Sequence, residues 1–184
     1  QGGASALTAG DWDGDGDLDL AAAIFSTNKV SILENDPPGV FNGIDTMPGQ
    51  LGANALAAGD WDGDGDPDLA VANFSTNNCY ILYYYLPCVF CAVDTISGQL
   101  GANALAAGDW DGDGDLDLAV ANFSTNKVSI LENDPPGVFK AVDTISGQDG
   151  ASALAVGDWD GDGDLDLAVA NRSANNVSIL ENEP

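Results

Sequence analysis

Short apolar runs separated by polar turns recur along the whole chain. The clearest stretch lies between residues 104 and 145, where four β-prone runs follow one another. These runs are Ala104–Gly108, Leu116–Asn122, Lys127–Glu132 and Val138–Ile145. No segment keeps an apolar period of about 3.6 residues, so the pattern predicts strands and essentially no helix.

The second of these runs, LDLAVAN at Leu116–Asn122, is apolar on both faces rather than alternating. Strands of this kind are usually buried on both sides. We therefore expect each group of strands to form a small sheet that lies between two neighbouring sheets.

The same unit occurs four times. The string GDWDGDGD recurs every 49 residues, with its first aspartate at Asp11, Asp60, Asp109 and Asp158. This spacing predicts one repeat domain over 1–184, with repeats at approximately 1–49, 50–98, 99–147 and 148–184. Four strands in each repeat of about 40–50 residues are typical of a β-propeller blade. The last repeat stops before its fourth run, so we expect an all-β, propeller-type array of four four-stranded blades whose last blade lacks its fourth strand.

The number of repeats leaves three assemblies open. A four-bladed ring closes with one incomplete blade, or two chains combine into a larger ring. In the third assembly, the chain is one protomer of an open array in which a neighbour supplies the missing strand by β-augmentation.

The net charge of the chain limits the classes of partner that it can bind. The 184 residues include 30 Asp and Glu, only 4 Lys and Arg, and no His, which gives a formal net charge of −26. So few basic residues disfavour nucleic-acid binding and attraction to an anionic membrane surface. No apolar run approaches the roughly 20 residues that span a bilayer, so we expect no membrane insertion. The chain opens with Gln1-Gly2-Gly3 and shows no signal peptide, so we expect a mature or excised piece.

Each repeat contains a nine-residue loop with aspartate at positions 1, 3, 5, 7 and 9 and glycine at position 6, as in Asp109–Asp117. Oxygen ligands at this density suit Ca²⁺, and without a cation the carboxylates would repel one another. We expect about four Ca²⁺, one per repeat, with side chains at positions 1, 3, 5 and 9 and the backbone carbonyl at position 7 as ligands. The loop aspartates are Asp11, Asp13, Asp15, Asp17, Asp19, Asp60, Asp62, Asp64, Asp66, Asp68, Asp109, Asp111, Asp113, Asp115, Asp117, Asp158, Asp160, Asp162, Asp164 and Asp166.

An EF-hand does not fit this loop. It needs a glutamate at position 12 and flanking helices, whereas position 12 here is Ala22, Val71, Val120 or Val169.

The repeat resembles the FG-GAP/VCBS family, the calcium-binding blade of integrin-alpha-type propellers and many bacterial surface proteins. The strings that carry the resemblance are ALAAGDWDGDGDLDLAVAN (Ala104–Asn122), VSILEN (Val128–Asn133) and GVF (Gly137–Phe139). The resemblance implies that the calcium loop joins the first and second strands of each blade. Integrin-type rings have seven blades, whereas this chain has four loops.

Aromatic and cysteine residues add two further expectations. The tryptophan at loop position 2 (Trp12, Trp61, Trp110, Trp159) is interpreted as a core aromatic between blades rather than a sugar-stacking platform.

The second repeat replaces the polar turn with Tyr83, Tyr84 and Tyr85, which form either a patch for a partner or glycan or a buried contact. It also adds Cys79, Cys88 and Cys91, for which a Cys79–Cys88 or Cys79–Cys91 disulfide is considered, with the pairing open.

Four N-glycosylation sequons start at Asn73, Asn122, Asn171 and Asn176. Three of them recur at the same hairpin turn of successive repeats, so glycans there would be displayed periodically. The alternative is that the AN-F-S string only encodes the turn.

The sequence indicates no catalysis, because it lacks His and no carboxylate pair stands apart from the repeat. We expect a non-catalytic, extracellular or cell-surface, calcium-stabilised adhesion or scaffold module. Its expected partners are itself, as a homo-oligomer or a filament of a surface fibre completed at the open last blade, or another surface protein or glycan. The alternatives are a lectin-like propeller and an accessory domain of a larger secreted protein.

Overall fold

Tight turns fold the chain into four antiparallel meanders, one per repeat. The computed structural model describes residues 3–85 and 88–182. Strand order follows sequence order in every sheet, and every neighbouring pair of strands is antiparallel. Sheet 1 consists of β1 (Ala4–Gly10), β2 (Asp19–Ile24), β3 (Lys29–Asn35) and β4 (Phe41–Pro48).

The next two sheets repeat this plan and the fourth is shorter. Sheet 2 consists of β5 (Ala53–Gly59), β6 (Asp68–Asn73), β7 (Asn78–Tyr85) and β8 (Cys88–Ser97). Sheet 3 consists of β9 (Ala102–Gly108), β10 (Asp117–Asn122), β11 (Lys127–Asn133) and β12 (Phe139–Ser146). Sheet 4 consists of β13 (Ala151–Gly157), β14 (Asp166–Asn171) and β15 (Asn176–Leu180).

In the described part of the chain, helix is limited to two single 3₁₀ turns, η1 (Phe25–Thr27) and η2 (Phe123–Thr125). The prediction of an all-β chain with strands in groups of four, four, four and three is therefore confirmed for the described residues. No helix in this part of the chain has the length and apolar character needed to cross a membrane.

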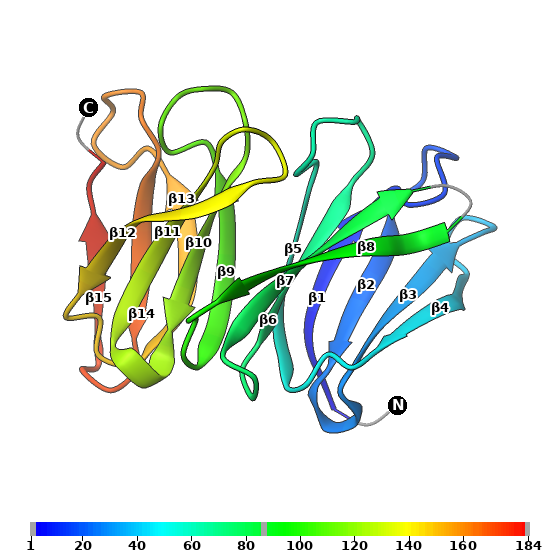
Figure 1. The fold of residues 1–184 in the computed structure, drawn as a ribbon, viewed down its shortest axis with the longest axis horizontal. Helices are drawn as coiled ribbons and strands as arrows, with labels where there is room; N and C mark the ends of the chain where they lie inside the picture. Colours follow the sequence, from blue (N-terminus) through cyan, green and yellow to red (C-terminus); the bar gives the residue numbers. More distant parts are fainter. Residues whose placement is uncertain (1–2, 86–87, 183–184) are drawn as a thin grey trace.

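The sheets stand side by side with their first strands in contact, β1 with β5, β5 with β9, and β9 with β13. In Figure 1, sheet 1 lies at the right end of the row and sheets 3 and 4 lie at the left, an arrangement like that of propeller blades. Small side chains make this close approach possible, because Ala53, Ala102 and Ala151 at the start of three first strands are fully buried.

The core lies between the sheets rather than within one. Strands β6 and β10 are buried along their whole length, as the two-faced apolar pattern predicts. One apolar cluster joins sheets 1 and 2, a second joins sheets 2 and 3, and a third joins sheets 3 and 4. Each sheet therefore depends on its neighbours for burial, as in other repeat proteins.

The same joint links each sheet to the next. Asn28, in the left-handed conformation at φ 56°, accepts a 2.9 Å hydrogen bond at Oδ1 from the backbone N–H of Gly52. Asn77 and Gly101 make the same bond between sheets 2 and 3, and Asn126 and Gly150 make it between sheets 3 and 4. These asparagine–glycine pairs, which we call the joints, fix where each sheet begins relative to the last.

Candidate metal centre

The four aspartate loops connect the first and second strands of the four sheets, for example between β1 and β2 and between β9 and β10. Glycines at loop positions 4 and 6 give the backbone its shape, because both have positive φ. In the third loop these angles are 78° at Gly112 and 99° at Gly114, with open space where a Cβ would lie. Other residues adopt this conformation at a cost, so both glycines are required. Position 4 is a backbone requirement that the sequence reasoning missed.

The position-1 aspartate organises each loop. In the third loop, Asp109 Oδ1 accepts a 2.8 Å hydrogen bond from the Gly112 N–H, and Oδ2 accepts a 3.0 Å bond from the Gly114 N–H. The same two bonds recur at Asp11, Asp60 and Asp158. The two position-1 oxygens are therefore held in place by the loop backbone itself.

The position-9 aspartates are buried, with exposed fractions between 0% and 2%. Asp117 accepts a 3.0 Å bond from the Trp110 N–H at the start of its loop and a 2.9 Å bond from the Asn133 N–H at the end of β11. Asp19, Asp68 and Asp166 each make the equivalent pair of bonds. This residue thus fastens the loop to the third strand of its sheet.

Carboxylate oxygens from three positions converge in every loop, within 4.8 Å of one another. Positions 1, 3 and 9 converge in three loops, and positions 1, 3 and 5 converge in the first. These groups are Asp11, Asp13 and Asp15; Asp60, Asp62 and Asp68; Asp109, Asp111 and Asp117; and Asp158, Asp160 and Asp166. The position-7 aspartates (Asp17, Asp66, Asp115 and Asp164) belong to none of these groups. Four of the predicted side-chain ligands are also outside them, namely Asp19 of the first loop and the position-5 residues Asp64, Asp113 and Asp162.

Burial and backbone hydrogen bonds shift the pKa of three of the position-9 aspartates. Burial raises the pKa of Asp68 to about 6, against two backbone hydrogen bonds that lower it, and Asp62 and Asp64 raise it further. Burial likewise raises the pKa of Asp117. In contrast, the backbone N–H groups of Asn182 and Trp159 lower the pKa of Asp166.

The donor set fits a hard divalent cation. Each group offers carboxylate oxygens without any nitrogen or sulfur ligand, which favours Ca²⁺ or Mg²⁺ over zinc or copper. Four such groups can hold four ions, one for each repeat.

Two glutamates that the sequence reasoning did not single out lie beside the loops. A hydrogen bond between the carboxyl groups of Glu34 and Asp13 raises the pKa of Glu34. Burial, followed by the charge of Asp111, raises the pKa of Glu132, which lies 98 residues further on. Glu34 and Glu132 occupy the same position relative to the loop of their own repeat, and this shared position is the signal from which both could have been found.

Sheet 2 has a tyrosine cluster in place of these polar residues. Tyr83 and Tyr84 are 8% and 4% exposed, so the prediction of an exposed partner patch is wrong for both. The Tyr83 hydroxyl donates a 3.1 Å hydrogen bond to the Gly137 carbonyl of sheet 3, and Tyr84 packs against Phe90. Tyr85 is 41% exposed, and its hydroxyl donates to Asp62 Oδ2 at 2.5 Å, which raises the pKa of Tyr85 to about 12.

The prediction of a core aromatic is confirmed for Trp12 and Trp61, whereas Trp110 is half-buried and Trp159 is exposed, so it is wrong for the last sheet. Trp12 and Trp61 are at most 1% exposed, and each meets a phenylalanine of the next sheet edge to face. Their rings are 6.2 Å from Phe90 and 5.8 Å from Phe139, respectively. Trp159, on the last sheet, is 51% exposed. A ring of sugar-stacking platforms is therefore absent from the described residues.

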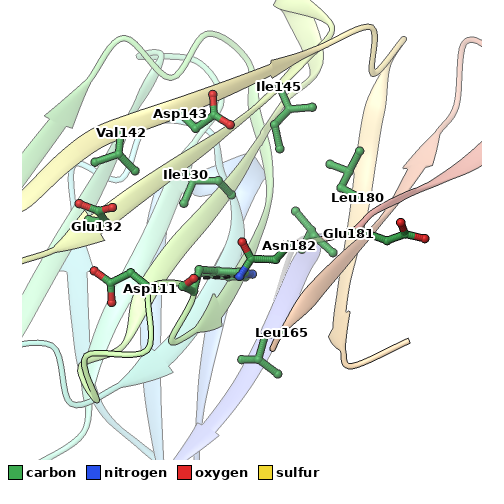
Figure 2. Close-up of a pocket in the computed structure, with 12 residues that line it drawn as sticks. Asp111, Ile130, Glu132, Val142, Asp143, Ile145, Leu165, Leu180, Glu181 and Asn182 are labelled. Atoms are coloured by element: carbon green, nitrogen blue, oxygen red, sulfur yellow. Dashed lines mark hydrogen bonds between the residues drawn. The ribbon is translucent and has the colours of Figure 1, made fainter. Parts of the chain in front are cut away.

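A cavity of about 210 Å³ lies beside the third loop, between sheets 3 and 4. Figure 2 shows the apolar side chains of Ile130, Val142 and Leu180 around it, together with the carboxylates of Asp111 and Glu132. It lies next to Trp110. At the equivalent positions between the earlier sheets, Phe90 of β8 packs on Trp12 and Phe139 of β12 packs on Trp61.

Three of the four predicted glycosylation sites are wrong for the folded chain. Asn73, Asn122 and Asn171 are at most 3% exposed, and their Nδ2 atoms donate to Gln50, Gln99 and Gln148, respectively. A glycan on Nδ2 has no room there, so the alternative interpretation of the AN-F-S string as turn chemistry fits better. Asn176 is exposed, and its glycosylation stays a prediction.

The disulfide considered for Cys79, to either Cys88 or Cys91, is not formed. Cys79 is a free, fully buried thiol, and burial raises its pKa. The strand register explains this, because Cys79 lies opposite Ile96 whereas Cys88 lies opposite Tyr85, at the other end of the same hairpin. The side chains of Cys88 and Cys91 lie outside the described residues.

The profile of the FG-GAP-like repeat matches the chain twice, over residues 11–71 and 109–169, and each match begins at a position-1 aspartate. The chain belongs to the FG-GAP-like repeat family. This confirms the resemblance drawn from the loop and strand motifs. No curated protein matches the sequence.

Several solved structures share the fold at low sequence identity. The Vibrio cholerae biofilm matrix protein Bap1 is similar at 19% identity and a TM-score of 0.63, over 96% of this chain and 26% of Bap1. BBS1N, solved in complex with ARL6DN, is similar at 18% identity and a TM-score of 0.64, over all of this chain and 55% of BBS1N. An auxiliary nutrient binding protein from Bacteroides ovatus is similar at 14% identity and a TM-score of 0.65, over 98% of this chain and 48% of that protein. This chain thus spans about a quarter to about half of the length of these larger proteins.

Proposed function

We propose that this FG-GAP-like chain is a non-catalytic, extracellular adhesion or scaffold module whose sheets are stabilised by about four Ca²⁺ ions, one per loop. The observation that carries the proposal is the convergence of three loop carboxylates in each of four repeats. The role of Bap1 as a biofilm matrix protein is of the same kind, and it supports the proposal by analogy of fold.

The chain's own residues would hold the ion through carboxylates at positions 1, 3, 5 and 9 and a carbonyl at position 7. Bound Ca²⁺ supplies positive charge that offsets the repulsion between these groups. The position-9 carboxylate also accepts hydrogen bonds from the start of the loop and from the third strand. An ion that holds this carboxylate in place would therefore hold the loop, the second strand and the third strand together. A bound ion would thus help to order the whole sheet, beyond the loop that binds it.

The expected affinity suits an extracellular site. Extracellular Ca²⁺ modules bind with a Kd of roughly 10⁻⁴–10⁻³ M, and millimolar Ca²⁺ would then add on the order of 0.5–2 kcal/mol per site. Four sites contribute a few kcal/mol, which is a large part of a typical folding stability of about 5–15 kcal/mol. Calcium would thus decide whether the array is ordered.

Calorimetric titration of the metal-free chain with Ca²⁺, followed by thermal melting with and without a chelator, tests the proposal. We expect about four bound ions per chain and a marked fall in Tm when the chelator is added. An unchanged melting curve would overturn the structural role of calcium. A titration with Mg²⁺ serves as the control. We expect weaker binding than for Ca²⁺, because Mg²⁺ demands near-ideal octahedral geometry and gives up its waters reluctantly.

A further inference from the structure

The first and last sheets each present an apolar face that no sheet within residues 3–85 and 88–182 covers. On sheet 4 this face, which we call the forward face, includes Trp159, Val177 and Ile179, with exposed fractions of 51%, 66% and 49%. On sheet 1 the opposite face, which we call the backward face, includes Leu7, Leu18 and Phe41, with exposed fractions of 61%, 64% and 45%. Contiguous exposed apolar patches of this kind mark interaction sites.

The equivalent positions inside the array are buried by the neighbouring sheet. Val128 and Cys79 stand 49 and 98 residues before Val177, and both are 0% exposed. Leu56 stands 49 residues after Leu7 and is 9% exposed. The same positions therefore change from exposed to buried as soon as a sheet packs against them.

The two end faces are the two halves of one interface. Each contact inside the array joins the forward face of one sheet to the backward face of the next, as when Val128 and Trp110 of sheet 3 cluster with Leu154 of sheet 4. Among the described residues, no sheet packs on the forward face of sheet 4 or on the backward face of sheet 1. We propose that the forward face of one chain packs against the backward face of a second copy, head to tail.

Aromatic positions match across this contact. Inside the array, Trp12 meets Phe90 and Trp61 meets Phe139, a phenylalanine of the fourth strand in the next sheet. Phe41 occupies this position in sheet 1, and Trp159 is the tryptophan of sheet 4. In the head-to-tail contact, Trp159 meets Phe41 of the second copy in the same edge-to-face manner.

A polar position matches as well. The Nδ2 of Asn133 donates to the Trp61 carbonyl of the preceding sheet, and that of Asn182 donates to the Trp110 carbonyl, both at 2.9 Å. Asn35 is the equivalent residue of sheet 1, and its exposed Nδ2 donates to the backbone carbonyl of Leu18, in its own sheet, at 3.2 Å. In the contact, Asn35 of the second copy turns to the Trp159 carbonyl.

The contact is heterologous, because the two partners use different faces. Such contacts form a closed ring when the rotation returns to its start, and a helical filament when it does not. Two copies therefore combine into a ring of eight sheets, or many copies combine into a filament, through one and the same interface. The inference rests on the proposed scaffold function and names its partner, a second copy of this chain.

Sedimentation velocity of the calcium-loaded chain, at concentrations from about 1 µM to about 1 mM, measures this association. We expect the mass to rise from one chain to two or more. Leu7→Asp on the backward face and Val177→Asp on the forward face each place a charge in the contact and lie outside the calcium loops. Each should weaken association by more than about tenfold. Leu100→Asp is the matched control, because Leu100 is 45% exposed in the connection between sheets 2 and 3 and should leave association unchanged.

Mixing the two variants tests the head-to-tail arrangement directly. The Leu7→Asp chain keeps an intact forward face and the Val177→Asp chain keeps an intact backward face. An equimolar mixture should therefore form a complex of one chain of each kind and nothing larger, whereas each variant alone stays monomeric.

Two results would overturn the inference. One is a wild-type chain that stays monomeric at every concentration, and the other is a mixture of the two variants that forms no complex. Melting of the same samples with and without a chelator separates this failure from a failure of the proposed function. A monomer that still loses stability without calcium contradicts the contact alone.

Discussion

At the scale of single residues, the aspartate at position 9 is buried in all four loops, and this burial decides how the loops respond to a cation. A buried carboxylate is costly unless it is compensated. At Asp68 and Asp117 the two backbone N–H groups supply only part of the compensation, whereas at Asp166 they outweigh burial. For Asp68 the raised pKa of about 6 shows that burial outweighs its two hydrogen bonds. A cation bound to these oxygens relieves that cost.

The third loop offers a matched pair of substitutions. Asp111 belongs to the converging group and Asp115 does not. We expect Asp111→Asn to reduce the calcium stoichiometry by one ion, or to weaken that site by at least about tenfold, which corresponds to about 1.4 kcal/mol. Asp115→Asn should leave four sites, because position 7 is expected to contribute a carbonyl. Calorimetric titration measures both variants.

Equal losses in the two variants would contradict the assignment of position 7, and no loss in either would contradict the assignment of the loop as a site. Thermal melting in excess chelator provides the control for folding. Without calcium, neither variant should melt far below the wild type, because each removes one negative charge from a crowded loop.

At the scale of elements, the joints determine how one sheet follows another. Gly101 has a φ of 70°, donates its N–H to Asn77 and accepts a 3.1 Å hydrogen bond from the Phe123 N–H. A Cβ on Gly101 would collide with the Ser124 side chain and lie 2.9 Å from the Ser124 backbone nitrogen. The joint thus requires glycine for two independent reasons.

Gly101→Ala should lower the free energy of unfolding by about 1–3 kcal/mol, because alanine is strained at this φ and its methyl group would collide with Ser124. Gly43→Ala is the control, since Gly43 lies in β4 with nothing near its Cβ position and no positive φ. We expect this control to change stability by no more than about 0.5 kcal/mol. Chemical denaturation in calcium measures both, and similar effects would contradict the importance of the joint.

Elements were also what the sequence predicted best, because four copies of one pattern define the same turns. The run predicted at Lys127–Glu132 is the strand Lys127–Asn133, and the turn predicted after Asn122 is a 3₁₀ turn. Contacts between distant positions could not be predicted in this way. The Asn73 sequon gave no sign that Gln50 would cover it, and the cysteine spacing gave no sign that Cys79 would lie opposite Ile96.

The loops show the same division between local and distant information. Their carboxylate register follows from sequence alone, because ligands that alternate along one short loop converge locally. That the position-9 carboxylate also bonds to the third strand depends on a residue 16 positions away, as with Asp117 and Asn133. Only the folded sheet brings those two groups together.

At the scale of the whole molecule, most of the net charge of −26 belongs to the four loops, which hold 20 of the 30 acidic residues. Four divalent ions would offset eight of those charges. The metal-free chain therefore carries strong self-repulsion, which opposes its compact state.

Salt should partly substitute for calcium. Raising the ionic strength from about 0.01 M to about 0.1 M shortens the Debye length from about 30 Å to about 10 Å and screens repulsion between exposed charges. We expect Tm in excess chelator to rise over this range, and to rise much less when calcium is present. Thermal melting in sodium chloride measures the effect, and a Tm independent of salt in the chelator would contradict it.

The joints also bear on how such a chain can arise and vary. Asn28 and Gly52, Asn77 and Gly101, and Asn126 and Gly150 stand 24 residues apart, and each pair repeats after 49 residues. An in-frame duplication or deletion of any 49-residue unit of the coding sequence, wherever its breakpoints fall, rebuilds a complete pair at the new junction. Unequal recombination between copies therefore changes the number of sheets without requiring any compensating substitution. Repeat number is a quantity that inheritance can adjust in single steps.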